Sequence, residues 1–183
     1  WENDIGVNLR FSRIGLFLEN HLKSESFEVI LNSLNKEGKY QGTGQNNLWY
    51  DQNALYRALI TNDVDQLKKV IEECLEYVLI LQTDNITQEA LQVDNSLYFH
   101  GVQFYSNGYG LSMFRDMSFW LFMLRDTQFA LNDEVKNRMS DYMLDGTRWT
   151  IRGDIAELYL GYRPYKIDVG YDNYAKEYIV PLE

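Results

Sequence analysis

The stretch YGLSMFRDMSFWLFMLR, residues 109–125, decides the fold class of this chain. Its apolar side chains recur every three or four residues, which is the spacing of one face of an α-helix. The residues on that face are Leu111, Phe114, Met117, Leu121 and Leu124. A half-buried strand would instead alternate strictly, so the stretch predicts a helix that packs against a core.

Helical spacing recurs along the chain on both sides of this stretch. It predicts further helices near residues 9–22, 27–34, 47–61, 63–82 and 133–144. Asp63 and Asn132 are typical N-cap residues, and Gly146 is predicted to be a C-terminal cap. Segment 83–107 is predicted to be irregular, with one short helix around TQEALQ, residues 87–92.

Paired helices joined by loops of alternating length predict an all-α fold. Stacked helical hairpins build a bundle, a solenoid or an α/α toroid, and residues 1–183 are long enough for a single domain with its own core. Polar, glycine-bearing loops at 38–47 and 94–110 are each followed at once by a helix. Sites gather where long loops gather, so we expect these two loops to converge on one cleft.

Composition excludes several classes of function. A formal net charge of −10 argues against nucleic acid as a partner, because phosphate binding needs a basic surface. No run of about twenty apolar residues is present, so no membrane span is expected. The one cysteine, Cys74, lies in a helical run and is expected in the core.

His100 and Tyr109 are the candidate catalytic residues of the irregular segment. His100 stands in a loop beside Gly101, nine positions before Tyr109, whereas His21 lies among charged residues and is expected at the surface. A lone loop histidine is more often structural than catalytic. Glycines flank Tyr109 on both sides and would let the backbone turn tightly and bring a side chain or ligand close. No spacing of ligand side chains predicts a metal site, and no glycine motif predicts a phosphate-bearing cofactor.

Several short blocks together resemble one known family. HGVQFYSNGYGLSMFRDMSFWLFMLRDTQFAL, residues 100–131, followed by YMLDGTRWTIRGD, residues 142–154, is similar to the helical catalytic domain of polysaccharide lyase family 8, the hyaluronate, chondroitin and xanthan lyases. TGQN, residues 43–46, resembles the family's Thr-Gly-Ala-Asn, and WENDIGVN, residues 1–8, its Trp-x-x-Glu-Ile-Gly-x-Pro. The matches follow the family's order and cover essentially the whole chain.

The resemblance implies an incomplete α/α toroid of antiparallel helical hairpins, whose cleft binds an acidic polysaccharide. Family members cut a uronic-acid-containing glycosaminoglycan, such as chondroitin sulfate or hyaluronan, by β-elimination and leave an unsaturated uronate. They use no metal or other cofactor for this step. The resemblance also implies a secreted or periplasmic bacterial protein, and a fragment that contacts the C-terminal β-sandwich domains of its own full-length chain.

The resemblance assigns four catalytic residues. Asn46 matches the asparagine that holds the uronate carboxylate, and His100 and Tyr109 match the proton-transfer pair. Arg163 matches the first arginine of the family's Gly-Arg-x-Ile-Ser-Arg segment. The second arginine of that segment would fall at Ile167 and is missing, and the neighbouring Lys166 is a cation of different geometry.

The chemistry of β-elimination fits these residue types. An amide donor such as Asn46 can stabilise the charge that develops on the carboxylate when the C5 proton leaves. A tyrosinate at Tyr109 is a strong base, but populating it at pH 7 costs roughly 4 kcal/mol from a reference pKa of about 10. A guanidinium such as Arg163 lowers that cost. Tyr109 could then protonate the leaving oxygen, and whether it or His100 is the base stays open.

Further residues are candidates for substrate binding. They are Trp1, Trp49, Asn107 and Lys166. Stacking on sugar faces is the predicted role of Trp1 and Trp49, while the alternative interpretation places Trp49, Trp120 and Trp149 in the core.

Two other functions fit the same sequence. A helical-toroid glycoside hydrolase would need two acidic residues across the cleft, and Asp94, Asp145 and Asp154 are candidates without a recognisable partner. The other possibility is a glycan-binding fragment without catalytic activity.

Overall fold

The computed structural model describes residues 2–34, 42, 44–79, 89–153 and 155–157. Most of these residues are helical, as the spacing of apolar residues predicted. The chain divides into two compact units. The first comprises Trp1–Gly42 and Asn46–Leu75, and the second comprises Thr43–Gln45 and Glu76–Glu183.

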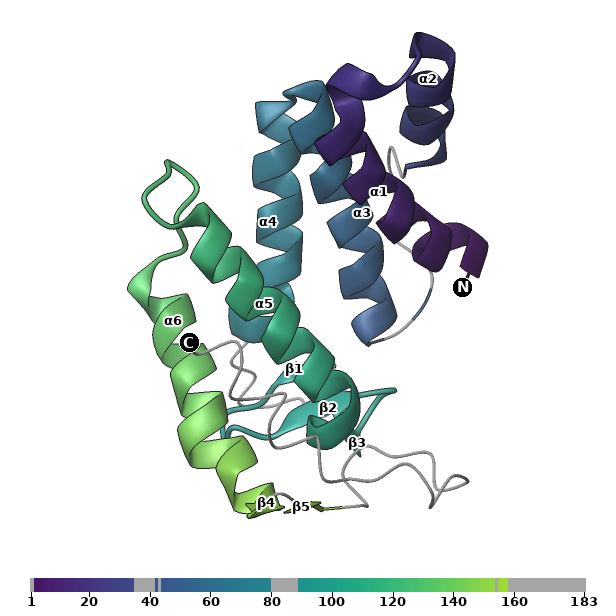
Figure 1. The fold of residues 1–183 in the computed structure, drawn as a ribbon. Coiled ribbons are helices and arrows are strands. Elements are labelled where there is room, and N and C mark those ends of the chain that lie inside the picture. The colour runs from purple at the N-terminus through teal and green to yellow at the C-terminus, as the bar shows by residue number, and fades with distance from the viewer. Residues whose placement is uncertain (1, 35–41, 43, 80–88, 154, 158–183) are drawn as a thin grey trace. The chain divides into compact units, whose positions relative to one another are not determined.

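The first unit is built from helices that pack closely at small residues. They are α1 (Val7–Leu18), α2 (Ser24–Ser33), α3 (Gln45–Thr61) and α4 (Val64–Leu79) (Figure 1). The first residue of α3 and the last residues of α4 belong to the second unit. A Cβ on Gly15 of α1 would lie 3.1 Å from side-chain atoms of both Ile30 and Ile60. Ile30, Ile60 and Leu34 form a buried cluster, and α1 meets it through this close approach and through the side chains of Phe11 and Leu16.

Sequence signals for helix starts are confirmed in both units. The N–H of Gln66 donates to Asp63 Oδ1 at 3.0 Å, as expected of an N-cap before α4. The N–H of Val135 donates to Asn132 Oδ1 at 3.1 Å before α6 (Asp133–Asp141). These side chains bind backbone donors that have no partner within the helix itself.

The second unit combines two helices with short antiparallel strands. Its helices are α5 (Leu111–Leu124) and α6, and Figure 1 shows them beside the strands β1 (Ala90–Leu91), β2 (Leu97–Phe99) and β3 (Gln103–Phe104). The strand order is β1-β2-β3, and β4 (Ile151–Arg152) pairs with β5 (Ile155–Ala156). A π-helical turn, Ser106–Gly110, leads into α5, and another, Tyr142–Gly146, follows α6. The Phe114 ring of α5 lies 6.2 Å from the Tyr142 ring, centroid to centroid, which joins the two helices through the core.

The prediction for segment 83–107 was wrong in its described part. Residues 90–91 form β1 instead of a helix, and both are buried because the strand pairs with β2 through Ala90 opposite Tyr98 and Leu91 opposite Leu97. Strands of two or three residues are too short to show the alternation by which strands are recognised. Pairing between neighbouring segments of the chain therefore decided a structure that the spacing of apolar residues did not predict.

Gly146 was also predicted wrongly as a C-terminal cap. Its φ of −109° and ψ of −82° are not the left-handed values of such a cap, and the chain continues into a 3₁₀ turn, Thr147–Thr150. A Cβ at this position would lie only 2.3 Å from the carbonyl oxygen of Asn95. The glycine is there because the loop before β2 approaches the backbone closely.

The tryptophans divide between core and surface. Trp120 is 7% exposed and Cys74 is buried, so both core predictions are confirmed. The core interpretation of Trp149 is wrong, because its side chain is 71% exposed and is covered on one side by the guanidinium of Arg148, 4.6 Å from the ring centroid. In the described part of the chain, no helix has both the length and the apolar character needed to cross a bilayer.

Candidate functional site

His100 occupies the tip of the hairpin between β2 and β3. Phe99 pairs with Gln103, so three residues connect the strands. His100 has φ of +52° and Gly101 has φ of +78°, both in the left-handed region. Glycine adopts this conformation freely, and histidine is among the side chains that adopt it more often than most. The turn places the His100 side chain in an exposed position.

Tyr109 lies in the π-helical turn Ser106–Gly110 and is half-buried. The glycine after it does not make a tight turn, because Gly110 has ordinary helical angles, φ −61° and ψ −41°. A Cβ at Gly110 would lie 2.4 Å from Tyr142 Oη and 2.9 Å from Leu97 Cδ2. Close packing therefore explains this glycine, and the predicted tight turn is wrong at Gly110.

The structure brings the two predicted catalytic rings together. The ring centroids of His100 and Tyr109 are 5.3 Å apart, at an interplanar angle of 45°. Phe99 packs edge-on against Tyr109 at 6.1 Å. Tyr105, which sequence analysis missed, lies 5.1 Å from Tyr109 and 5.8 Å from His100. Its only signal in the sequence is its place four residues before Tyr109, one helical turn away.

Asn107 lies in the same turn as Tyr109 and is buried, with 6% of its surface exposed. Its Nδ2 donates to the carbonyl oxygen of Glu157 at 3.0 Å, and its Oδ1 accepts from Thr150 Oγ1 at 3.1 Å. Both ends of the amide therefore bind groups of the chain itself. This geometry supports a role in holding the Ser106–Gly110 turn against the segment that follows α6.

Asn46 and Trp49 belong to the first unit, on α3, and both are half-buried. Tyr50 lies one helical turn after Asn46, and its pKa is raised by burial and by the negative charges of Asp4 and Asp51. A raised pKa keeps the phenol protonated, so Tyr50 is poorly suited to act as a base.

The remaining predicted residues lie outside the described part of the chain. They are Trp1, Arg163, Lys166 and Asp154. Among the residues that are described, no group of three or more histidine, cysteine or acidic side chains could hold a metal ion.

Asp94, one of the acidic residues considered for a hydrolase, does not have the property that a general acid needs. Ser96 Oγ donates to Asp94 Oδ1 at 2.6 Å, and this bond holds the pKa of Asp94 below its usual range. A glycosidase acid needs the opposite, a raised pKa that keeps its proton near neutral pH. Asp145 is exposed and pairs with Arg148 at 3.5 Å.

Replacing Ser96 with alanine should weaken the acid sensitivity of folding. Asp94 has a lower pKa in the folded chain than in the unfolded chain, so its contribution to stability is present above the unfolded value and is lost as pH falls through the folded one. In Ser96→Ala the two values move closer, and the free energy of unfolding should change less between about pH 6 and about pH 3. Urea unfolding at the two pH values measures this. Ser140→Ala, at an exposed serine of α6, is the control. If the free energy of unfolding changes between the two pH values as much in Ser96→Ala as in the wild type, the role of this bond is contradicted.

Comparison with known proteins places this arrangement in a family. Residues 1–154 match the model of polysaccharide lyase family 8, N-terminal alpha-helical domain. A chondroitinase AC lyase solved in complexes with oligosaccharides is similar over 99% of this chain, with 23% identity and a TM-score of 0.83. Among curated proteins, the search found no match.

Two further solved structures are similar in fold. A Paenibacillus xanthan lyase matches over 100% of the chain with 16% identity and a TM-score of 0.76. The chondroitin AC lyase of Streptomyces coelicolor A3 in complex with chondroitin sulphate matches with 14% identity and a TM-score of 0.76. The chain spans 27%, 17% and 26% of the three solved chains, in the order given. The chain therefore belongs to polysaccharide lyase family 8, and its residues 1–154 match the family's N-terminal α-helical domain.

Proposed function

We propose that this chain supplies the helical part of the active site of a lyase that cleaves chondroitin sulfate or hyaluronan by β-elimination. The observation that carries the proposal is the pair of rings at His100 and Tyr109, 5.3 Å apart. One comes from a hairpin tip and the other from the turn before α5. Because the chain belongs to polysaccharide lyase family 8, we expect His100 and Tyr109 to transfer protons during the elimination.

The surroundings of Tyr109 suit proton transfer to and from its phenol. Phe99 and Tyr105 are buried and cover the ring, so they fix its orientation. His100 is exposed and can reach a polymer that enters from solvent. A proton acceptor that is held in place avoids the entropic cost of finding the C5 hydrogen in each turnover.

The proposed reaction divides the work among four residues. Asn46 donates to the uronate carboxylate and stabilises the charge that develops on it. The guanidinium of Arg163 stabilises negative charge that develops during proton transfer, and Tyr109 or His100 removes the C5 proton. The protonated phenol of Tyr109 then donates to the leaving C4 oxygen, which completes the elimination without water as a reactant.

The same proposal covers the partners and location of the chain. Trp49 would stack on a sugar ring, and Trp1 and Lys166 would contact the polymer. The chain spans about a quarter of the length of the similar chondroitinase, so we propose that β domains of the full-length protein complete the cleft. A polymer substrate outside the cell also requires a secreted or periplasmic enzyme.

Ultraviolet absorbance tests the proposal directly, because β-elimination creates a conjugated double bond. The chain alone and the longer protein encoded around it are incubated separately with chondroitin sulfate and with hyaluronan. We expect the absorbance to rise with the longer protein. New reducing ends without absorbance would indicate a hydrolase, and binding without either product would indicate a glycan-binding protein.

A further inference from the structure

A single carboxylate, that of Glu89, joins two turns that are far apart in the sequence. Glu89 directly precedes β1 and is half-buried. Its Oε1 accepts from the N–H of Gly101 at 2.8 Å, and its Oε2 accepts from the N–H of Gly44. Hydrogen bonds to a charged acceptor are roughly twice as strong as bonds between neutral groups.

Both turns carry residues of the proposed reaction. Gly101 directly follows His100, and the two share left-handed backbone angles. Gly44 is also left-handed, with φ of +62°, and a Cβ there would lie 3.1 Å from Cβ and Cγ of Phe99. Gly44 belongs to the TGQN segment, which ends at Asn46.

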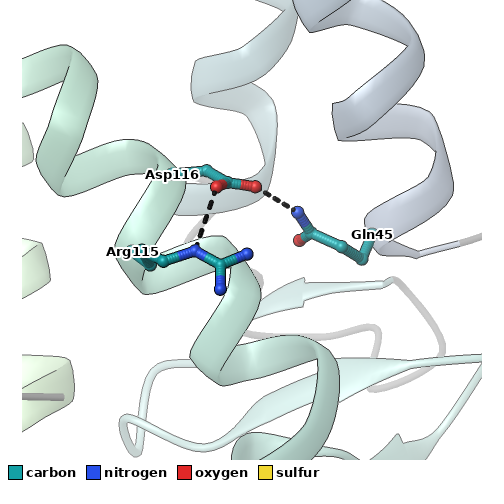
Figure 2. Close-up of polar contacts among 3 residues, drawn as sticks. All are labelled: Gln45, Arg115 and Asp116. Carbon is teal, nitrogen blue, oxygen red and sulfur yellow. Dashed lines mark hydrogen bonds and ion pairs between the residues drawn. The ribbon is translucent and has the colours of Figure 1, made fainter. Parts of the chain in front are cut away.

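A second carboxylate holds the TGQN segment from another side. Asp116 of α5 accepts from Gln45 Nε2 at 2.9 Å, as Figure 2 shows. The other oxygen of Asp116 lies 3.5 Å from Arg115 Nε. The Gln45 side chain is fully buried, so this bond fixes it in one orientation. Glu89 therefore holds the backbone at Gly44, while Asp116 holds the side chain of the next residue.

We propose that Glu89 is a positioning residue of the lyase reaction, and this inference rests on the proposed function. It fixes the His100 turn and the Gly44 turn with the two oxygens of one side chain. A non-glycine residue in left-handed conformation is strained, so the bonds of its neighbours help His100 to keep it. Without the bond to Gly101, the turn relaxes and the His100 ring leaves its place beside Tyr109.

Glu89→Gln tests this role with the smallest change of shape. A glutamine has one acceptor oxygen instead of two, so at least one of the two backbone N–H groups loses its partner. In the longer protein we expect kcat to fall about 10- to 100-fold and KM to change less than about threefold, because misplacement of a catalytic group chiefly affects the chemical step. The rate of unsaturated product formation measures both constants.

Asp116→Asn is the matched control, because it is also a carboxylate-to-amide change on a residue that holds the TGQN segment. It leaves the His100 turn untouched, so we expect a loss in kcat of less than about fivefold. Amide NMR on the isolated chain adds a readout without substrate. The Gly101 N–H should exchange faster with solvent in Glu89→Gln and at the wild-type rate in Asp116→Asn.

The outcomes separate the positioning role from the function. If the wild-type longer protein is active and Glu89→Gln has the same kcat, the positioning role is overturned but the proposed function is not. Equal losses in Glu89→Gln and Asp116→Asn would overturn it too, because a general loss of structure would explain both. An inactive wild-type longer protein would overturn the proposed function, and the positioning role with it, whatever the amide spectra show.

Discussion

Tyr109→Phe will lower kcat for chondroitin sulfate or hyaluronan by about 10³-fold, because it removes the hydroxyl that protonates the leaving oxygen and that is one of the two candidates for the base. The ring itself stays, with its contacts to His100 at 5.3 Å and to Phe99 at 6.1 Å, so folding should be unaffected. The rise in ultraviolet absorbance measures the rate, and circular dichroism checks the fold.

Tyr105→Phe is the matched control for this prediction. Tyr105 belongs to the same ring cluster, 5.8 Å from His100, but it is buried with 7% of its surface exposed. Loss of its hydroxyl should reduce kcat by less than about tenfold. Equal losses at Tyr105 and Tyr109 would mean that the cluster acts only as packing, and the assignment of Tyr109 would fail.

Gly110→Ala will destabilise the second unit by about 2 to 3 kcal/mol, near the upper end of the usual cost of overpacking. The added Cβ would lie 2.4 Å from Tyr142 Oη, 2.9 Å from Leu97 Cδ2 and 3.1 Å from the carbonyl oxygen of Tyr105. Tyr142 and Leu97 are fully buried, so neither can move aside cheaply. Urea denaturation gives the free energy of unfolding.

A double-mutant cycle with Tyr142→Phe identifies the source of that cost. The Tyr142 hydroxyl donates to the carbonyl oxygen of Ser106 at 3.3 Å, and its loss alone should cost about 1 kcal/mol. The same change removes the atom that an added Cβ at Gly110 meets first. The double variant should therefore be less destabilised than the sum of the single variants. Simple additivity would show that the clash with the hydroxyl is not the cause.

Local signals in the sequence predicted the helices and their starts. Apolar spacing found α5, and Asp63 and Asn132 bind the backbone groups that such side chains usually bind. The strands β1 and β2 were not predicted, because they are too short to show the alternation of apolar and polar residues. The role of Gly146 was predicted wrongly because its close neighbour, the carbonyl of Asn95, is 51 residues earlier in the chain.

The candidate site was predictable in its residues but not in its geometry. Family resemblance pointed to His100 and Tyr109, while their separation of 5.3 Å depends on a hairpin and a π-helical turn that spacing did not predict. No pattern in the sequence indicated a role for Glu89. Its partners, Gly44 and Gly101, lie 45 and 12 residues away, and an acidic residue in an irregular segment is ordinary.

The anchoring of the TGQN segment has a consequence for the order of folding. Gln45 is separated from its partner Asp116 by 71 residues, so the loop between them must close before the bond can form. During synthesis at about 5 to 20 residues per second, Gln45 waits roughly 4 to 14 seconds until Asp116 has been made. Any nascent chain that stalls before residue 116 carries the TGQN segment without this anchor. The anchoring of the start of α3 is therefore a late, high-contact-order step, because its partner is synthesised 71 residues after Gln45.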